Sequence, residues 1–77
     1  MATVRIMNTA PLMLVRINGQ PHQLPAEATL LQAIEVAGIA PPFAAAVNLQ
    51  FVPKGQYALT VLRPNDDIEL IAPVTGG

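Results

Sequence analysis

The residues best suited to chemistry in this chain are its last five, Pro73-Val74-Thr75-Gly76-Gly77. A terminal carboxylate can itself be a reactive group, and two residues without Cβ make a narrow, bendable segment that could enter a confined site of a partner enzyme. A frayed chain end is the plain alternative, because terminal residues are often disordered and tolerate any small residue. The two glycines therefore indicate an acyl-carrying end only if the rest of the chain agrees.

Other candidates for catalysis or metal binding are weak. His22, the only histidine, lies in a proline-flanked segment without Asp, Glu or Ser nearby, so we expect a solvated strand residue and not a general base. Asp66 and Asp67 adjoin at a turn, and adjacent strand residues point to opposite faces, so they do not easily share one ion. The chain has no cysteine, which excludes disulfides, thiolate metal sites and cysteine nucleophiles. We expect no catalytic residue, no metal site and no bound cofactor.

The composition indicates one small domain without a deep pocket of its own. The 77 residues are 52% hydrophobic and 12% charged, with a net charge of −1; a chain of this length buries only about 60% of its unfolded surface. Lys and Arg form no cluster that could neutralise phosphates, which argues against a nucleic-acid partner. No apolar run approaches the roughly 20 residues of a membrane span. We therefore expect a cytoplasmic protein that does not bind membranes.

The first strongly patterned segment is a hairpin. Residues 13–17 alternate, with Val15 and Ile17 on one face and Leu14 and Arg16 on the other. The following Asn18-Gly19 pair is a strong hairpin signal, since both residue types tolerate positive φ. The return strand over 20–24 contains Pro21 and is followed by Pro25, which places it near an edge or a strand end.

A short helix follows the hairpin. Thr29 is a good N-cap, and Gln32, three residues on, completes a capping box. Gly38 fits a left-handed C-cap, and two prolines forbid continuation, so the helix is about 8 residues long. The predicted apolar stripe consists of Leu30, Leu31, Ile34 and Ala37.

The remaining segments complete a small sheet. Residues 43–48 read as a buried central strand, 51–52 as a short strand, and 68–72 as the last strand after a turn at 64–66. The stretch 54–62 reads as a loop with one helical turn, anchored by Tyr57, Leu59 and Leu62. The connection from the hairpin through the helix to the next strand is a crossover, which predicts a parallel pair near the centre.

This order of elements predicts an α+β fold, a ubiquitin-like β-grasp with a mixed four- to five-stranded sheet packed on one main helix. We expect the domain over 13–72, a flexible tail over 73–77, and an N-terminal extension over 1–12 that is either disordered or an extra edge strand.

From residue 13 onward the chain resembles the ThiS family, the small sulfur carrier proteins of thiamin biosynthesis. The resemblance rests on the order and spacing of four stretches, none specific by itself: 13–19, 45–48, 52–62 and 65–77. Two positions depart from the family pattern, where glycine is common in place of Leu49 and of Asn65. Asn65 is a mild change, whereas positive φ at Leu49 would be strained, so we expect a different turn geometry there.

The resemblance implies that this protein is a carrier and co-substrate, not an enzyme. A ThiF-type enzyme would adenylate the Gly77 carboxylate with ATP, sulfur would replace AMP to give a thiocarboxylate, and a ThiG-type thiazole synthase would receive the sulfur. Gly77 would carry the sulfur and Gly76 would provide clearance. We expect partners to dock on the outer sheet face, on an apolar patch with two charged residues at its rim; the patch comprises Leu14, Ala44, Ala46 and Ile71, and the rim Arg16 and Glu69.

Other functions fit the same features. The small subunit of molybdopterin synthase, MoaD, is similar in fold, activation chemistry and Gly-Gly end. A ubiquitin-like modifier of lysines would also share them. A different class is a β-grasp interaction domain with an idle tail, for which deleting Gly76 and Gly77 would change nothing.

Overall fold

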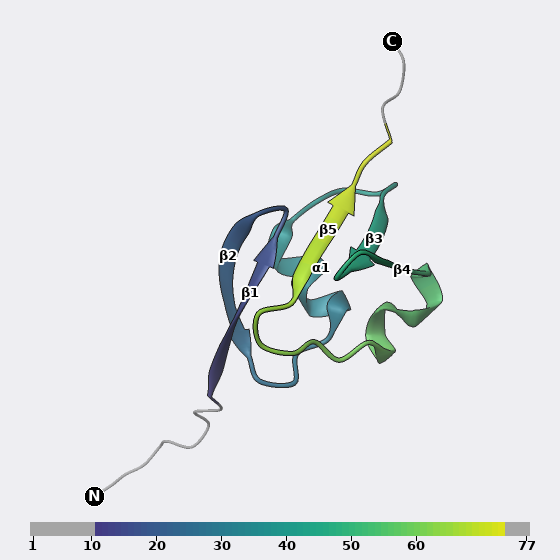
Figure 1. The fold of residues 1–77 in the computed structure, drawn as a ribbon. Helices are drawn as coiled ribbons and strands as arrows, with labels where there is room; N and C mark the ends of the chain where they lie inside the picture. Colours follow the sequence, from purple (N-terminus) through teal and green to yellow (C-terminus); the bar gives the residue numbers. More distant parts are fainter. Residues whose placement is uncertain (1–10, 74–77) are drawn as a thin grey trace, which may run out of the picture.

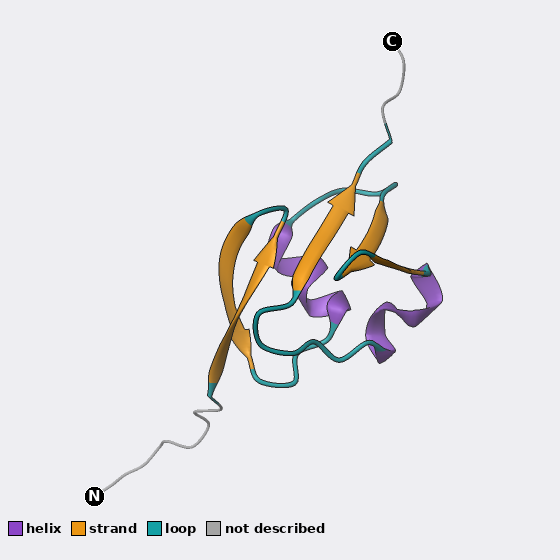
Figure 2. Ribbon diagram, in the orientation of Figure 1, coloured by secondary structure: helices purple, strands orange, loops and turns teal. Residues whose placement is uncertain are grey.

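The computed structural model describes residues 11–73, which form a five-stranded mixed sheet with one α-helix and a short 3-10 helix (Figures 1 and 2). The elements are β1 (Leu12–Ile17), β2 (Gln20–Pro25), α1 (Leu30–Ala37), β3 (Ala44–Val47), β4 (Gln50–Val52), η1 (Lys54–Leu59, 3-10) and β5 (Asp67–Ile71). The predicted α+β class and β-grasp architecture are confirmed. Of the predicted N-terminal extension only residues 11 and 12 are described, and Leu12 already begins β1.

The opening hairpin forms as the alternation predicts. Met13, Val15 and Ile17 are buried, and the residues between them are exposed. Asn18 and Gly19 have φ of 51° and 81°, the double positive φ of a tight hairpin turn whose twist matches that of the strands. β2 pairs only with β1 within the described sheet, which places it at an edge.

The helix has the predicted limits and both predicted caps. The Thr29 side chain accepts from the Gln32 backbone N–H, the Gln32 side chain accepts from the Thr29 N–H, and Gly38 is left-handed at φ 70°. The predicted stripe was wrong at Leu31, which is 38% exposed, whereas Ala33 is fully buried. Residues three and four apart share a helix face, so Ala33 and Ile34 face the core with Leu30, and Leu31 is turned away by about 100°.

The strand order is β2-β1-β5-β3-β4, so β5 and not β3 is the middle strand. The predicted parallel pair exists, but its members are β1 and β5, with Arg16 opposite Asp67 and Ile17 opposite Ile68. β5 lies between β1 and β3 in the sheet. The connection from the hairpin through α1 to β3 therefore passes over the place of β5. Figure 1 shows β5, in yellow, between β1 and β3 with α1 behind the sheet.

One apolar core lies between the sheet and α1. Its largest fully buried side chains are Leu30, Ile68 and Val15. Tyr57 and Leu62 anchor the segment after β4 as predicted, and the Tyr57 ring stacks on Phe43 with centroids 6.1 Å apart. The prediction of Leu59 as a third anchor is wrong: its side chain is 72% exposed. At about three residues per turn, a side chain two residues after Tyr57 points away from the side that Tyr57 occupies.

Candidate functional site

The chain leaves the sheet from its middle strand, which anchors the segment that leads to the C-terminus. Ile68 and Leu70 of β5 are buried, whereas Glu69, Ile71 and the following residues through Pro73 are exposed. Gly76 and Gly77, and with them the predicted tail flexibility, lie outside the described residues. Because β5 is paired on both sides, a pull on the tail would be resisted by strand pairing with both β1 and β3.

Five of the six residues predicted for the docking face lie close together in register. Ala44 is opposite Ile71, Ala46 is opposite Glu69, and Arg16 lies beside Asp67 on the other flank of β5. Directly opposite residues point to the same face of the sheet. The buried residues of these strands alternate with the predicted ones, so the predicted residues lie on the outer face.

Leu14 lies two positions before Arg16 on the same face, at the end of β1 farthest from Ile71. It lies on the outer face, 40% exposed, but its carbonyl accepts from the backbone N–H of Asn65, before β5 begins. Leu14 is therefore about six residues, or roughly 20 Å, from Ile71 along the strand direction.

Phe51 is an apolar residue of the outer face that sequence reasoning missed. It pairs with Ala46 across the β3–β4 hairpin and is 68% exposed. The hairpin could have predicted this position, because a two-residue connection after Val47 pairs Val47 with Gln50 and therefore Ala46 with Phe51. The row across this face therefore reads Phe51, Ala46, Glu69, with Ala44 and Ile71 as the next pair toward the tail.

Two asparagine side chains hold β5 from its two sides. The Asn18 amide donates to the Leu70 carbonyl at 3.2 Å, and its Oδ1 accepts from the Leu70 N–H at 2.9 Å. Asn48 Oδ1 accepts from the Asp67 N–H at 3.0 Å, and its amide donates to Asp66 Oδ1 at 2.9 Å. Each asparagine is the first residue of a hairpin turn, so the two hairpins fix the strand that carries the tail.

The second of these turns corrects the prediction for Leu49. Asn48 and Leu49 have φ of 51° and 70°, so the turn has the same double positive φ as Asn18-Gly19 and not a different geometry. A two-residue connection between antiparallel strands favours this turn, because its twist matches the strands. The requirement of the hairpin outweighs the preference of leucine for negative φ.

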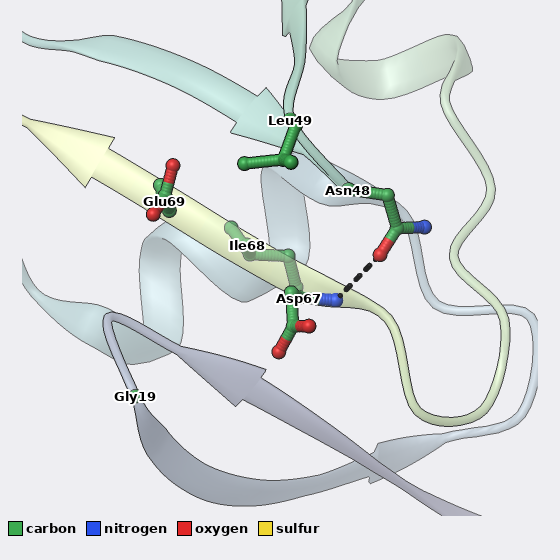
Figure 3. A pocket seen from close by; sticks show the side chains of 6 residues that line it. All are labelled: Gly19, Asn48, Leu49, Asp67, Ile68 and Glu69. Carbon is green, nitrogen blue, oxygen red and sulfur yellow. Dashed lines mark hydrogen bonds between the residues drawn. The ribbon is translucent and has the colours of Figure 1, made fainter.

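A groove of about 420 Å³ lies beside the two turns and over β5. Its lining residues are Gly19, Asn48, Leu49, Asp67, Ile68 and Glu69. Figure 3 shows Leu49 extending from its turn over β5, with Asp67 and Glu69 along the strand and the hydrogen bond from Asp67 N–H to Asn48.

The remaining candidates carry no site within the described residues. Asp66 accepts from the Arg63 N–H at 2.8 Å, a turn role, and Asp67 forms an ion pair with Arg16 at 2.9 Å. Residues 11–73 hold no group of three or more His, Cys, Asp or Glu placed to bind a metal ion. In that same range no helix is long and apolar enough to cross a membrane.

These features define a β-grasp domain whose central strand leads directly into the C-terminal segment, with exposed apolar residues on its outer sheet face, namely Leu14, Phe51 and Ile71. A family model described as the ThiS family matches residues 15–77, so the chain belongs to the ThiS family, whose members are sulfur carrier proteins of thiamin biosynthesis and not enzymes.

Comparison with solved structures agrees in fold. The chain is similar to the crystal structure of the thiamine biosynthesis protein ThiS from Geobacter metallireducens, with a TM-score of 0.71 and 16% identity over 84% of this chain and 100% of that one. No curated protein matches the sequence.

Proposed function

We propose that this protein carries sulfur as a thiocarboxylate on its C-terminal Gly77 and delivers it for the thiazole of thiamin. The observation that carries the proposal is that the family match extends from the first strand through residue 77 and so includes the two terminal glycines. The partners are a ThiF-type adenylating enzyme and a ThiG-type thiazole synthase. The protein itself binds no cofactor, and ATP is consumed by the adenylating enzyme.

The chemistry requires activation because a carboxylate is a poor electrophile. The Gly77 carboxylate attacks the α-phosphorus of ATP, forming an acyl-adenylate and releasing pyrophosphate. A sulfur nucleophile then attacks the acyl carbon, AMP leaves with the electrons of the broken C–O bond, and the thiocarboxylate remains. Glycine at 76 and 77 leaves the reacting carbonyl free of neighbouring side chains.

The length of the tail suits delivery into an enclosed site. Extended, the five residues 73–77 reach roughly 16 Å, enough to enter a partner while the folded domain stays outside. The exit from the middle strand supports this role, because the domain can be held by its sheet face while the tail is processed.

The outer sheet face is the proposed docking surface. It combines the predicted residues Ala44, Ala46, Ile71, Arg16 and Glu69 with Phe51, which extends the apolar row. Exposed apolar residues gathered on one face favour contact with a protein partner over contact with water alone.

The test is the intact mass of the full chain after incubation with ATP, a sulfide source and a ThiF-type adenylating enzyme. The expected result is a mass gain that corresponds to one oxygen replaced by sulfur, with no gain in a chain lacking Gly77. Thermal unfolding of the two chains should agree, which excludes misfolding as the cause. An unchanged mass with an enzyme active on its own carrier would overturn the proposal and favour an interaction domain with an idle tail.

The acceptor is tested separately. Thiocarboxylated protein should support thiazole formation by the synthase, whereas transfer only to a molybdopterin synthase large subunit would assign the chain to the MoaD-like alternative. The family match favours the thiamin acceptor.

A further inference from the structure

The first hairpin turn contains an asparagine followed by a glycine, Asn18-Gly19, and both residues are exposed to solvent (Figure 3). In such a pair the backbone nitrogen of the glycine can attack the side-chain Cγ of the asparagine, because glycine has no side chain to hinder ring closure. No atom lies within 4 Å of the position that a Cβ of Gly19 would occupy. Within residues 11–73 the Gly19 N–H donates no backbone hydrogen bond. The reacting nitrogen is therefore accessible.

The second hairpin turn provides an internal contrast. Its φ values are 51° and 70°, close to the 51° and 81° of the first turn, but its asparagine, Asn48, is followed by Leu49. The branched side chain of leucine crowds the ring closure that glycine permits. The molecule therefore holds one reactive and one hindered asparagine in equivalent turns.

Asn18 also holds β5 in place near its C-terminal end. Its backbone N–H donates to the Ile68 carbonyl at 2.8 Å, and its side-chain amide forms two hydrogen bonds with the backbone of Leu70. These two side-chain bonds are here named the Leu70 clamp. The amide nitrogen that would leave as ammonia donates one of them, and Oδ1 accepts the other. Ring closure at Gly19 therefore requires the amide to turn away from Leu70 and to break both bonds.

We propose that Asn18 is a deamidation site whose reaction is slowed by the Leu70 clamp and, once it has occurred, removes the clamp. The Gly19 nitrogen loses its proton and bonds to Asn18 Cγ, the Cγ–Nδ2 bond breaks, and ammonia leaves with the electron pair and that proton. The product is a succinimide. Water, the one co-reactant, then adds to either succinimide carbonyl and breaks its bond to the nitrogen, which leaves aspartate or isoaspartate.

Both products weaken the hold on β5. Aspartate has no N–H to donate to the Leu70 carbonyl, so a carboxylate oxygen would face a carbonyl oxygen. Isoaspartate adds one carbon atom to the main chain, and a two-residue turn whose twist must match its strands does not accommodate it. Because β5 leads into the C-terminal segment, the modification loosens the strand from which the tail emerges.

The test follows each asparagine of the full chain during incubation in mildly alkaline buffer, by peptide mapping with mass spectrometry. Asn18 should gain the mass that corresponds to an NH group replaced by oxygen, and a methyltransferase specific for isoaspartate should label the same peptide. Asn48, in the equivalent turn, is the internal control and should remain unmodified over the same period. No modification of Asn18, or modification of Asn48 at the same rate, would overturn the site.

Two variants separate the reactivity of the residue pair from opening of the strand. Leu49→Gly creates a second asparagine–glycine pair and should raise the modification rate of Asn48 several-fold. Gly19→Ala should slow modification of Asn18 several-fold, although alanine strains the turn and so favours opening. Faster modification in Gly19→Ala would show that opening alone sets the rate, which would overturn the assignment to ring closure at Gly19.

The protective role of the clamp is tested by comparing the folded chain with the chain unfolded in urea. Two hydrogen bonds of ordinary net strength should slow modification of Asn18 about 10- to 30-fold in the folded chain. In Leu49→Gly, Asn48 lies in the same kind of turn but its bonds are exposed to water, so its slowing should be smaller. Equal slowing at the two asparagines would assign the protection to the turn conformation and overturn the role of the clamp.

The effect of the modification on β5 is measured on modified protein that ion-exchange chromatography has separated from the parent chain. The Leu70 amide should exchange its hydrogen about tenfold faster than in the parent chain, since the clamp bonds are lost. Unchanged exchange at Leu70 would overturn the link between Asn18 and the strand. These measurements use no partner enzyme, so their outcome is independent of the thiocarboxylation test.

Discussion

The two hairpin turns of this domain are built alike and differ at one residue. Asn18-Gly19 joins β1 to β2, and Asn48-Leu49 joins β3 to β4, with φ of 51° at both asparagines. Each asparagine binds the backbone of β5, yet the second residue is relaxed in one turn and unfavourable in the other. The comparison separates two roles: the side chain at the first position bonds to β5, and the residue at the second position only has to accept positive φ.

The two asparagine side chains supply hydrogen bonds of different kinds to β5. β1 ends at Ile17, while β5 continues to Ile71, so Leu70 has no strand residue beside it on the β1 side. The Asn18 amide pairs with both the N–H and the carbonyl of Leu70, as a strand residue would, in a partly buried setting. Asn48 instead ties together the start of β5 and the preceding turn, in an exposed setting.

The largest effect is therefore expected at Asn18. In Asn18→Gly the backbone keeps a residue that accepts positive φ, but both hydrogen bonds to Leu70 are lost. The free energy of unfolding should fall by about 2 to 3 kcal/mol, since partly buried backbone groups lose their partners. Urea denaturation followed by circular dichroism measures the change. A loss no larger than that of the matching variant Asn48→Gly would show that the contribution of these hydrogen bonds to stability does not depend on their burial.

The same change in the other turn should be milder. Asn48→Gly removes bonds to Asp67 and Asp66 that water can replace, so the loss should be about 1 kcal/mol. Native-state hydrogen exchange offers a local readout: the Asp67 amide should exchange faster in this variant, and the Leu70 amide should not. Equal acceleration at both amides would mean that β5 opens as one unit and would remove the distinction between its two ends.

Local rules predicted much of the fold because they act over a few residues. The alternation in β1, the capping box at Thr29 and the left-handed Gly38 each depend on neighbours in sequence, and the structure has all three. The position of β5 depends on pairing with β1, about fifty residues away, and no periodicity within either segment encodes it. Strand order therefore had to come from the structure.

The candidate site shows the same division. The alternation put Ala46 and Glu69 on outer faces, but only the register shows that they are opposite each other and that Phe51 adjoins them. Leu14 lies on the predicted outer face, and its separation of about six residues from Ile71 along the strand direction is a fact of register that alternation alone does not reveal. Leu49 was misjudged because residue preference was weighed without the length of the connection, and the two-residue connection dictated the turn.

The smallest effect, and the one of opposite sign, is expected at the second turn position. Leu49→Gly relieves the left-handed conformation but gives the unfolded chain more freedom, so the net gain should be about 0.5 to 1 kcal/mol. Gly19→Ala is the reverse change: a Cβ there meets no atom within 4 Å, so its loss of about 1 kcal/mol would be backbone strain alone.

Denaturation midpoints of these two variants and of the double variant test whether the turns are equivalent. Additive shifts of opposite sign are expected, because a Cβ at Gly19 would meet no atom within 4 Å and so would not contact Leu49. If Leu49→Gly were destabilising, the leucine would have a stabilising contact in the free protein that outweighs the cost of its left-handed backbone conformation.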